Sequence, residues 1–257
     1  MPWPSFSRVR EISGPPPGYG AGAWTELYAG VPAIAETIAL ATLFELVRDT
    51  KARVHLCRLS SAAGVALVRA AKAEGLPVSC DVSVNNLHLI DVDIGYFNAA
   101  MRVTPPLRQQ RDRDALRAGL ADGTIDALVS DHTPVKEDGK ALPFAESESG
   151  ATGLELLLSL ALKWAQDSGI PLEQALGTVT HRPAGVVGAA FGAFASSAGR
   201  LVVGGAADIC VFDPQAAWTV EGSALRSQGR HTPFGGYELP GRVRTTIVGG
   251  HVAYQAP

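Results

Sequence analysis

Two short apolar runs of this chain carry side chains that can do chemistry at or near their carboxyl ends. Asp131 and His132 follow the apolar run 127–130, and His55 lies within the run 53–57. α/β barrels present metal ligands and general bases at the carboxyl ends of buried strands. A lone histidine in an apolar run is also common as a packed core residue, and an aspartate at a strand end can act as a cap. Taken alone, the residues leave both interpretations open.

Composition narrows the class of protein. The chain has 257 residues, of which 46% are hydrophobic, and a net charge of -3. This length supports one sizeable core, or a main core with a small satellite. The near-neutral charge lacks the basic stripe of a nucleic-acid-binding protein. No apolar run reaches the roughly 18 residues of a membrane span, and the amino terminus lacks the order of a signal peptide. We therefore expect a cytoplasmic globular protein without nucleic-acid or membrane partners.

Helix-like and strand-like segments alternate after a Pro/Gly-rich start. Residues 1–30 should be extended or disordered, because proline removes backbone donors and glycine raises the entropy lost on ordering. Beyond them, alternation predicts a parallel sheet covered by helices. Helices are expected at 36–49, 62–74, 111–121, 153–166 and 172–187, and strands at 53–57, 78–84 and 127–130. Thr152 and Glu155 have the spacing of a capping box for the helix from Gly153.

The pattern changes beyond Gly188. Short expected strands at 201–203, 209–212 and 244–248 are separated by Gly and Pro turns. We therefore divide the chain into a Pro/Gly-rich segment (1–30), an α/β body (31–190) and a small β domain (191–257). A closed (β/α)8 barrel needs roughly 200 to 250 residues, and the α/β body provides only about 160 residues and roughly three or four strands. The sheet is therefore either open or part of a larger barrel.

An ordered set of motifs resembles one family. The motifs are His55-Leu56-Cys57-Arg58-Leu59-Ser60, Thr104-Pro105-Pro106-Leu107-Arg108, Ser130-Asp131-His132-Thr133-Pro134, Gly153-Leu154-Glu155, Gly204-Gly205-Ala206-Ala207-Asp208 and Thr232-Pro233-Phe234-Gly235-Gly236. From about residue 31 onward the chain resembles the C-terminal part of class I dihydroorotase, of the amidohydrolase superfamily. The resemblance implies part of a (β/α)8 amidohydrolase barrel plus a small β unit. It also implies a zinc hydrolase of pyrimidine biosynthesis that interconverts dihydroorotate and N-carbamoyl-L-aspartate.

The resemblance assigns roles to several residues. His55 matches a metal ligand, and Asp131 matches the carboxylate that binds metal and moves the proton. The family's His-His pair falls on Asn85-Asn86, whose amides are poor zinc ligands, so His88 would be the third ligand only after a register shift. The family's substrate-binding positions fall on Thr104 and Val135. The upstream His-x-His pair and the metal-bridging residue have no counterpart in this sequence.

Other polar residues receive structural interpretations. His132 fixes the turn after its strand, whereas His181 and His231 are structural or surface residues. Arg108 belongs to a solvated helix start, and the segment 136–140 is a flexible loop near the site.

These substitutions favour a chain that has little or no activity alone. The first interpretation is a dihydroorotase whose remaining catalytic residues are absent or supplied elsewhere. The second is a non-catalytic homologue that serves as a structural partner of aspartate carbamoyltransferase. The composition of residues 1–30 favours a third, a truncated or frame-shifted gene product. An incomplete barrel exposes an edge strand and an apolar face, so self-association is expected.

Overall fold

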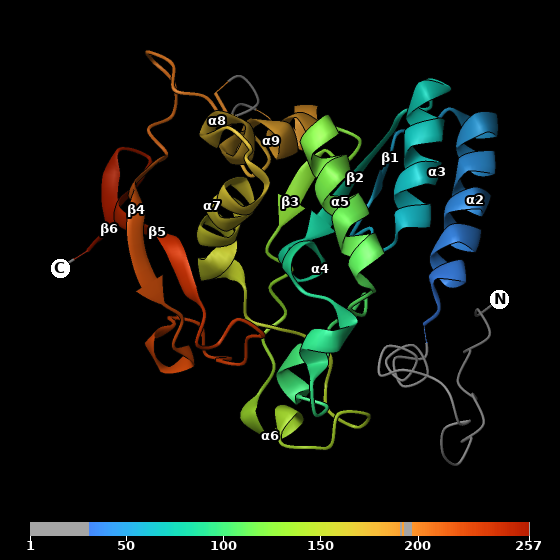
Figure 1. The fold of residues 1–257 in the computed structure, drawn as a ribbon. Helices are drawn as coiled ribbons and strands as arrows, with labels where there is room; N and C mark the ends of the chain where they lie inside the picture. Colours follow the sequence, from blue (N-terminus) through green and yellow to red (C-terminus); the bar gives the residue numbers. More distant parts are fainter. Residues whose placement is uncertain (1–30, 191, 193–196, 257) are drawn as a thin grey trace.

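The computed structural model of the chain describes residues 31–190, 192 and 197–256 (Figure 1). The disorder expected at residues 1–30 lies outside this range. The longer helices are α2 (Ala33–Thr50), α3 (Ala62–Ala73), α5 (Gln110–Asp122) and α7 (Leu157–Ser168), and the shorter ones are α4 (Val84–His88), α6 (Glu137–Lys140), α8 (Leu172–Gly177) and α9 (His181–Val187). The strands are β1 (Val54–Leu56), β2 (Val78–Ser83), β3 (Ala127–Val129), β4 (Ile209–Thr219), β5 (Glu238–Val248) and β6 (His251–Gln255).

The first three strands form a parallel sheet in the order β1-β2-β3. Val54 pairs with Val78 at one side of β2, and Asp81 pairs with Ala127 at the other. Figure 1 shows α2, α3 and α5 side by side along this sheet, as the strand–helix alternation predicted. Parallel strands bring their carboxyl ends to one edge, so the segments after β1, β2 and β3 meet there.

Side-chain alternation gives β2 two distinct faces, because successive residues of a strand point to opposite sides. One set of its residues is apolar and the other polar: Val78, Cys80 and Val82, and Ser79, Asp81 and Ser83. Cys80 and Val82 are fully buried within the main core, and the Cys80 thiol donates to the Thr124 carbonyl. The polar set therefore lies on the other face, where chemistry is possible.

Helix α2 is tied to the start of α3 by a single carboxylate. Ser61 is the N-cap of α3, and its hydroxyl accepts the N–H of Gly64. Glu36 in turn accepts the backbone N–H and hydroxyl groups of both Ser60 and Ser61. A hydrogen bond to a charged group contributes about 1.5–3 kcal/mol. This contact therefore fixes the position of α2 relative to the amino-terminal end of α3.

The last three strands form a separate antiparallel sheet, as a small β unit predicts. The expected strand at 201–203 is a turn-rich segment instead. The other two strands are longer than the sequence indicated, since irregular pairing between Asp213 and Ala217 lets β4 continue beyond Pro214. Trp218 of β4 donates its indole N–H to the Ser159 hydroxyl of α7, which joins this sheet to the helices.

Two local expectations were wrong because long-range partners take the side chains. Glu155 does not close a capping box: its carboxylate accepts the backbone N–H groups of Arg226 and Ser227. Arg108 is not solvated: it is 5% exposed. Its guanidinium donates to the Ser60 hydroxyl and to the Val31 carbonyl. Both side chains therefore connect distant parts of the fold.

Helix α2 turns an apolar side to solvent. Ile34, Ile38 and Leu46 are 60%, 61% and 55% exposed, whereas Leu40, Phe44 and Val47 are buried against the rest of the body.

Within the described residues, no helix combines the length and the apolar character needed to cross a membrane.

Candidate functional site

Asp131 lies just beyond β3 and is held by two partners. Its Oδ1 lies 3.0 Å from Nη1 of Arg58, and its Oδ2 accepts the Ser83 hydroxyl at 3.1 Å. The Asp131 side chain is 8% exposed, whereas that of Arg58 is 40% exposed. Arg58 follows β1 and Ser83 ends β2, so the carboxyl ends of all three parallel strands contribute to this contact.

The backbone at both ends of this ion pair is unusual. Arg58 has a φ of 61° and Asp131 a φ of 48°, in the left-handed region that residues with a Cβ rarely adopt. Such conformations carry a strain of roughly 1–3 kcal/mol and concentrate at functional sites. They turn both side chains toward each other at the edge where the strands end.

Thr104 lies beside the ion pair of Arg58 and Asp131. Val135 follows Asp131 by four residues and is buried. The Thr104 carbonyl accepts a second hydrogen bond from Nη1 of Arg58 at 3.0 Å, and its hydroxyl bonds that of Ser149 at 2.7 Å. Val135 is 4% exposed and contributes only apolar contacts. Asp131 and Thr104 thus converge on Arg58, a residue to which sequence reasoning gave no role.

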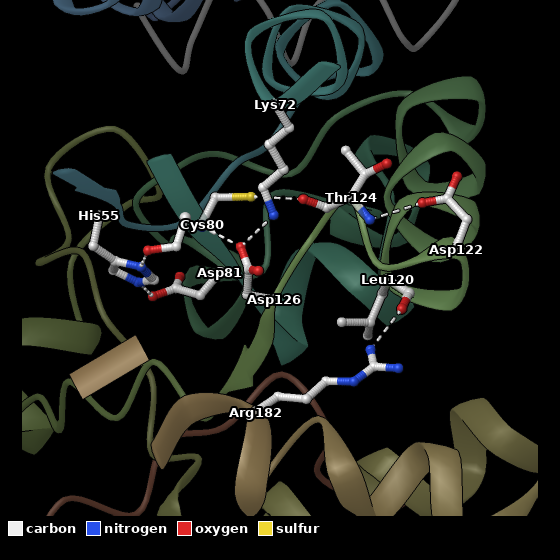
Figure 2. Close-up of polar contacts among 10 residues, drawn as sticks. His55, Lys72, Cys80, Asp81, Leu120, Asp122, Thr124, Asp126 and Arg182 are labelled. Carbon is white, nitrogen blue, oxygen red and sulfur yellow. Dashed lines mark hydrogen bonds and ion pairs between the residues drawn. The ribbon is translucent and has the colours of Figure 1, made fainter. Parts of the chain in front are cut away.

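His55 belongs to a second network on the polar face of β2 (Figure 2). Its Nδ1 lies 2.8 Å from the Ser79 hydroxyl and its Nε2 lies 3.0 Å from Oδ2 of Asp81. The other oxygen of Asp81 accepts the backbone N–H of Arg58 at 2.7 Å. His55 and Asp131 are therefore linked only indirectly, because Arg58 contacts Asp81 through its backbone and Asp131 through its side chain.

His88 lies in the core, away from either network. Its Nε2–H donates to the Leu160 carbonyl at 2.9 Å, and its ring meets Phe234 edge-on. Burial lowers the pKa of His88 to about 3, and the nearby Arg117 charge acts in the same direction. His88 is therefore a neutral core residue with a structural role, because its N–H group is hydrogen-bonded and its ring packs against Phe234.

Other expected residues have structural roles. His132 fixes its turn as predicted, since its Nδ1 accepts the N–H groups of Gly153 and Leu154. The segment 136–140 contains the short helix α6, and its Lys140 is buried with its ammonium group donating to the Ala99 and Arg102 carbonyls. Burial lowers the pKa of Lys140 to about 8. This segment is therefore anchored, contrary to the expectation of a flexible loop.

The metal set implied by resemblance does not fit this arrangement. Asp131 is engaged by Arg58, whose positive charge opposes a cation at the same oxygen. The amides of Asn85 and Asn86 are buried, and His88 points into the core. The trio His55, Asp131 and His88 is therefore not brought together.

A different trio lies close together. Within the described part of the chain, one group of three metal-binding side chains has ligand atoms within 4.8 Å of one another: His55, Cys57 and Asp81. Sequence reasoning missed Cys57 and Asp81. The available signal was the spacing of Cys57 two residues after His55, together with one carboxylate inside the otherwise uncharged run of β2.

A cavity of about 480 Å³ lies at the opposite, amino-terminal edge of the parallel strands. Arg53 and Arg182 line it, but both guanidinium groups donate to backbone carbonyls, those of Gly185 and Val186 and that of Leu120. Asp126 also lines the cavity and is paired with Lys72 (Figure 2); its Oδ2 lies 2.7 Å from Nζ of Lys72. The charged groups that line this cavity are thus already bonded to other parts of the fold.

Comparison with known proteins places these features in context. The model of the amidohydrolase family matches residues 29–253. A dihydroorotase-like protein of Pseudomonas aeruginosa is 44% identical over 227 residues, which is 88% of this chain and 52% of that protein. A dihydroorotase of Citrifermentans bemidjiense is 36% identical over the same shares of the two chains. The chain thus spans about half the length of the curated relatives it matches.

Solved structures agree on the fold. The L-hydantoinase of Arthrobacter aurescens superimposes with a TM-score of 0.81 at 27% identity, over 89% of this chain and 50% of that protein. The D-hydantoinase of Thermus sp. gives the same TM-score at 24% identity, over 91% and 51%. Together with the curated relatives, these structures confirm the partial amidohydrolase barrel and the resemblance to dihydroorotases.

Proposed function

Because this chain belongs to the amidohydrolase family, we propose that it is a dihydroorotase-like cyclic amide hydrolase by descent, and that the chain alone does not turn over substrate. Its proposed ligands are dihydroorotate and N-carbamoyl-L-aspartate, in the pyrimidine pathway of the cytoplasm. The names of the curated relatives support this substrate class. The proposed lack of turnover comes from the site itself.

The observation that carries the proposal is the double engagement of Asp131. One carboxylate oxygen is paired with Arg58 and the other accepts a hydrogen bond from Ser83. Opening a cyclic amide needs a group that polarises the carbonyl, together with a base that moves the proton. Asp131 is our candidate for this base. An arginine paired with this carboxylate occupies one of its oxygens and opposes the binding of a cation there.

The remaining candidate residues support binding better than catalysis. Arg58 presents a partly exposed guanidinium group, which matches a substrate carboxylate in shape and charge. Thr104 lies next to it and is exposed, whereas Val135 is buried and offers little surface to a ligand. Zinc at Asp131 remains part of the proposed ancestry and has no step in this chain's chemistry.

A cyclisation assay tests the proposal directly. The chain and the variant Asp131→Ala are mixed with N-carbamoyl-L-aspartate, and dihydroorotate formation is followed. We expect no rate above the uncatalysed background for either protein. Turnover by the unmodified chain that disappears in Asp131→Ala would overturn the inactive interpretation.

The same ion pair favours a second candidate function, a structural partner of aspartate carbamoyltransferase. A chain whose site carboxylate is paired with its own arginine can still assemble with another protein. Co-purification of the two proteins in mild salt tests this function. Elution as two separate peaks in size-exclusion chromatography would count against it.

A further inference from the structure

The polar face of β1 and β2 carries three metal-binding groups of three different kinds. Leu56 pairs with Cys80, so Cys57 and Asp81, one residue further along each parallel strand, stand opposite each other. His55 lies two residues before Cys57 and so points to the same side. The imidazole nitrogen, the thiol sulfur and a carboxylate oxygen all lie within 4.8 Å of one another.

We propose that His55, Cys57 and Asp81 bind one zinc ion, at a position distinct from Asp131. Nitrogen, sulfur and oxygen donors together suit zinc, whereas magnesium and calcium prefer oxygen alone. Three protein ligands leave a fourth, solvent-facing position. This site goes beyond the proposed function, because it holds whether or not the chain turns over substrate.

The spacing of the donor atoms fits a tetrahedral ion. Two nitrogen or oxygen ligands of one zinc ion lie roughly 3.4 Å apart, given metal–ligand distances near 2.1 Å. Nε2 of His55 and Oδ2 of Asp81 bond each other at 3.0 Å, so a zinc ion would replace this contact after the two atoms move apart by about 0.4 Å. Cys57 is exposed, and a change of its side-chain rotamer can bring the sulfur closer to the other two ligand atoms.

Neighbouring groups already orient the side chains of His55 and Asp81. Metal-binding imidazoles use their second nitrogen in a hydrogen bond that fixes the ring. Here Nδ1 of His55 bonds the Ser79 hydroxyl, which leaves Nε2, now bonded to Asp81, as the nitrogen that would bind the metal. Asp81 uses Oδ1 to accept the Arg58 backbone N–H, and its Oδ2, which bonds His55 in the metal-free chain, is the oxygen that would bind the metal. The Arg58 guanidinium is held by Asp131 and Thr104, so it does not occupy the position itself.

Metal titration of the full chain tests the site. We expect one zinc ion per chain after dialysis against a chelator and titration with ZnCl2. Cobalt(II) in place of zinc should give an intense thiolate-to-metal absorption band in the near ultraviolet. Cys57→Ser should abolish that band and lower zinc affinity by well over tenfold, and Ser79→Ala should lower affinity by roughly 10- to 100-fold.

Matched variants separate this site from others. Cys210→Ser removes another exposed thiol, on β4, and should keep both the band and the affinity. Asp131→Asn should also keep them, because Asp131 is not one of the three ligands. The absence of stoichiometric zinc in the unmodified chain, or binding that survives Cys57→Ser, would overturn the proposal. Loss of zinc in Asp131→Asn with retention in Cys57→Ser would overturn it too, by moving the metal to Asp131. Turnover in the cyclisation assay would refute the proposed inactivity and leave the zinc site standing.

Discussion

Mild acid should weaken this fold through one buried histidine. His88 is enclosed by the core, and its Nε2–H donates to the Leu160 carbonyl. Burial lowers the pKa of His88 to about 3 from the ordinary 6.5, with Arg117 adding to the decrease. Between these two pKa values the unfolded chain binds the proton and the folded chain does not. Stability is therefore fully present above pH 6.5 and is lost as the pH falls toward 3.

The size of the effect follows from proton linkage. At pH 5 a histidine with an ordinary pKa is almost fully protonated in the unfolded chain, which stabilises that state by about 2 kcal/mol relative to pH 7. A loss of this size is a large part of the 5–15 kcal/mol that typically separates a folded domain from its unfolded chain. It should appear as a lower urea midpoint with an unchanged slope.

A variant isolates the contribution of His88. His88→Gln keeps an N–H donor near the Nε2 position but has no group that titrates in this range. Urea unfolding, followed by far-UV circular dichroism at pH 7 and pH 5, should show that the variant loses about 2 kcal/mol less than the unmodified chain between the two pH values. His251→Gln, on the exposed strand β6, serves as the control and should lose as much as the unmodified chain. Equal losses in His88→Gln and the unmodified chain would refute this account of His88.

Three further outcomes follow from contacts described above. Glu36→Gln should lower the free energy of unfolding by about 1.5–3 kcal/mol in chemical denaturation, because it weakens the charge-assisted contacts to Ser60 and Ser61; Glu45→Gln, on the exposed side of α2, should change it by less than about 0.5 kcal/mol. Gly153→Ala should lower the melting temperature, because the added methyl carbon would lie 2.4 Å from the Ser130 carbonyl oxygen. The control Gly185→Ala, where the methyl carbon meets open space, should leave the melting temperature unchanged. An unchanged melting temperature in Gly153→Ala would contradict the close approach of Gly153 to Ser130. In metal-free protein a thiol reagent at pH 8 should modify Cys57 and Cys210 while folded and Cys80 only after unfolding, since burial raises the pKa of Cys80 to about 12; rapid modification of all three thiols would contradict the burial of β2.

Local sequence patterns predicted the α/β body well, because its elements follow one another along the chain. The strands near His55 and Asp131 and the helices between them lie close to their expected ranges. The pattern failed where a partner lies far away in sequence. Glu155 bonds residues about seventy positions later, and β4 extends through irregular pairing with β5.

The candidate site was only partly predictable for the same reason. The spacing of residues indicated that Asp131 lies at a strand end, and this is where the structure has it. It could not indicate that Arg58, after another strand, adopts a positive φ and pairs with that carboxylate. His88 shows the converse: its residue type fits a ligand, but its position on α4 directs it into the core.

The outward side of α2 has a consequence for how the molecule behaves in solution. Ile34, Ile38 and Leu46 keep apolar surface in contact with water, at a free-energy cost of about 25 cal/mol for each Å². Any surface that covers this stripe recovers part of that energy and binds the folded state alone. If a second copy of the chain provides that surface, the free energy of unfolding should increase with protein concentration. The exposed side of α2 would then stabilise the fold only in the associated state.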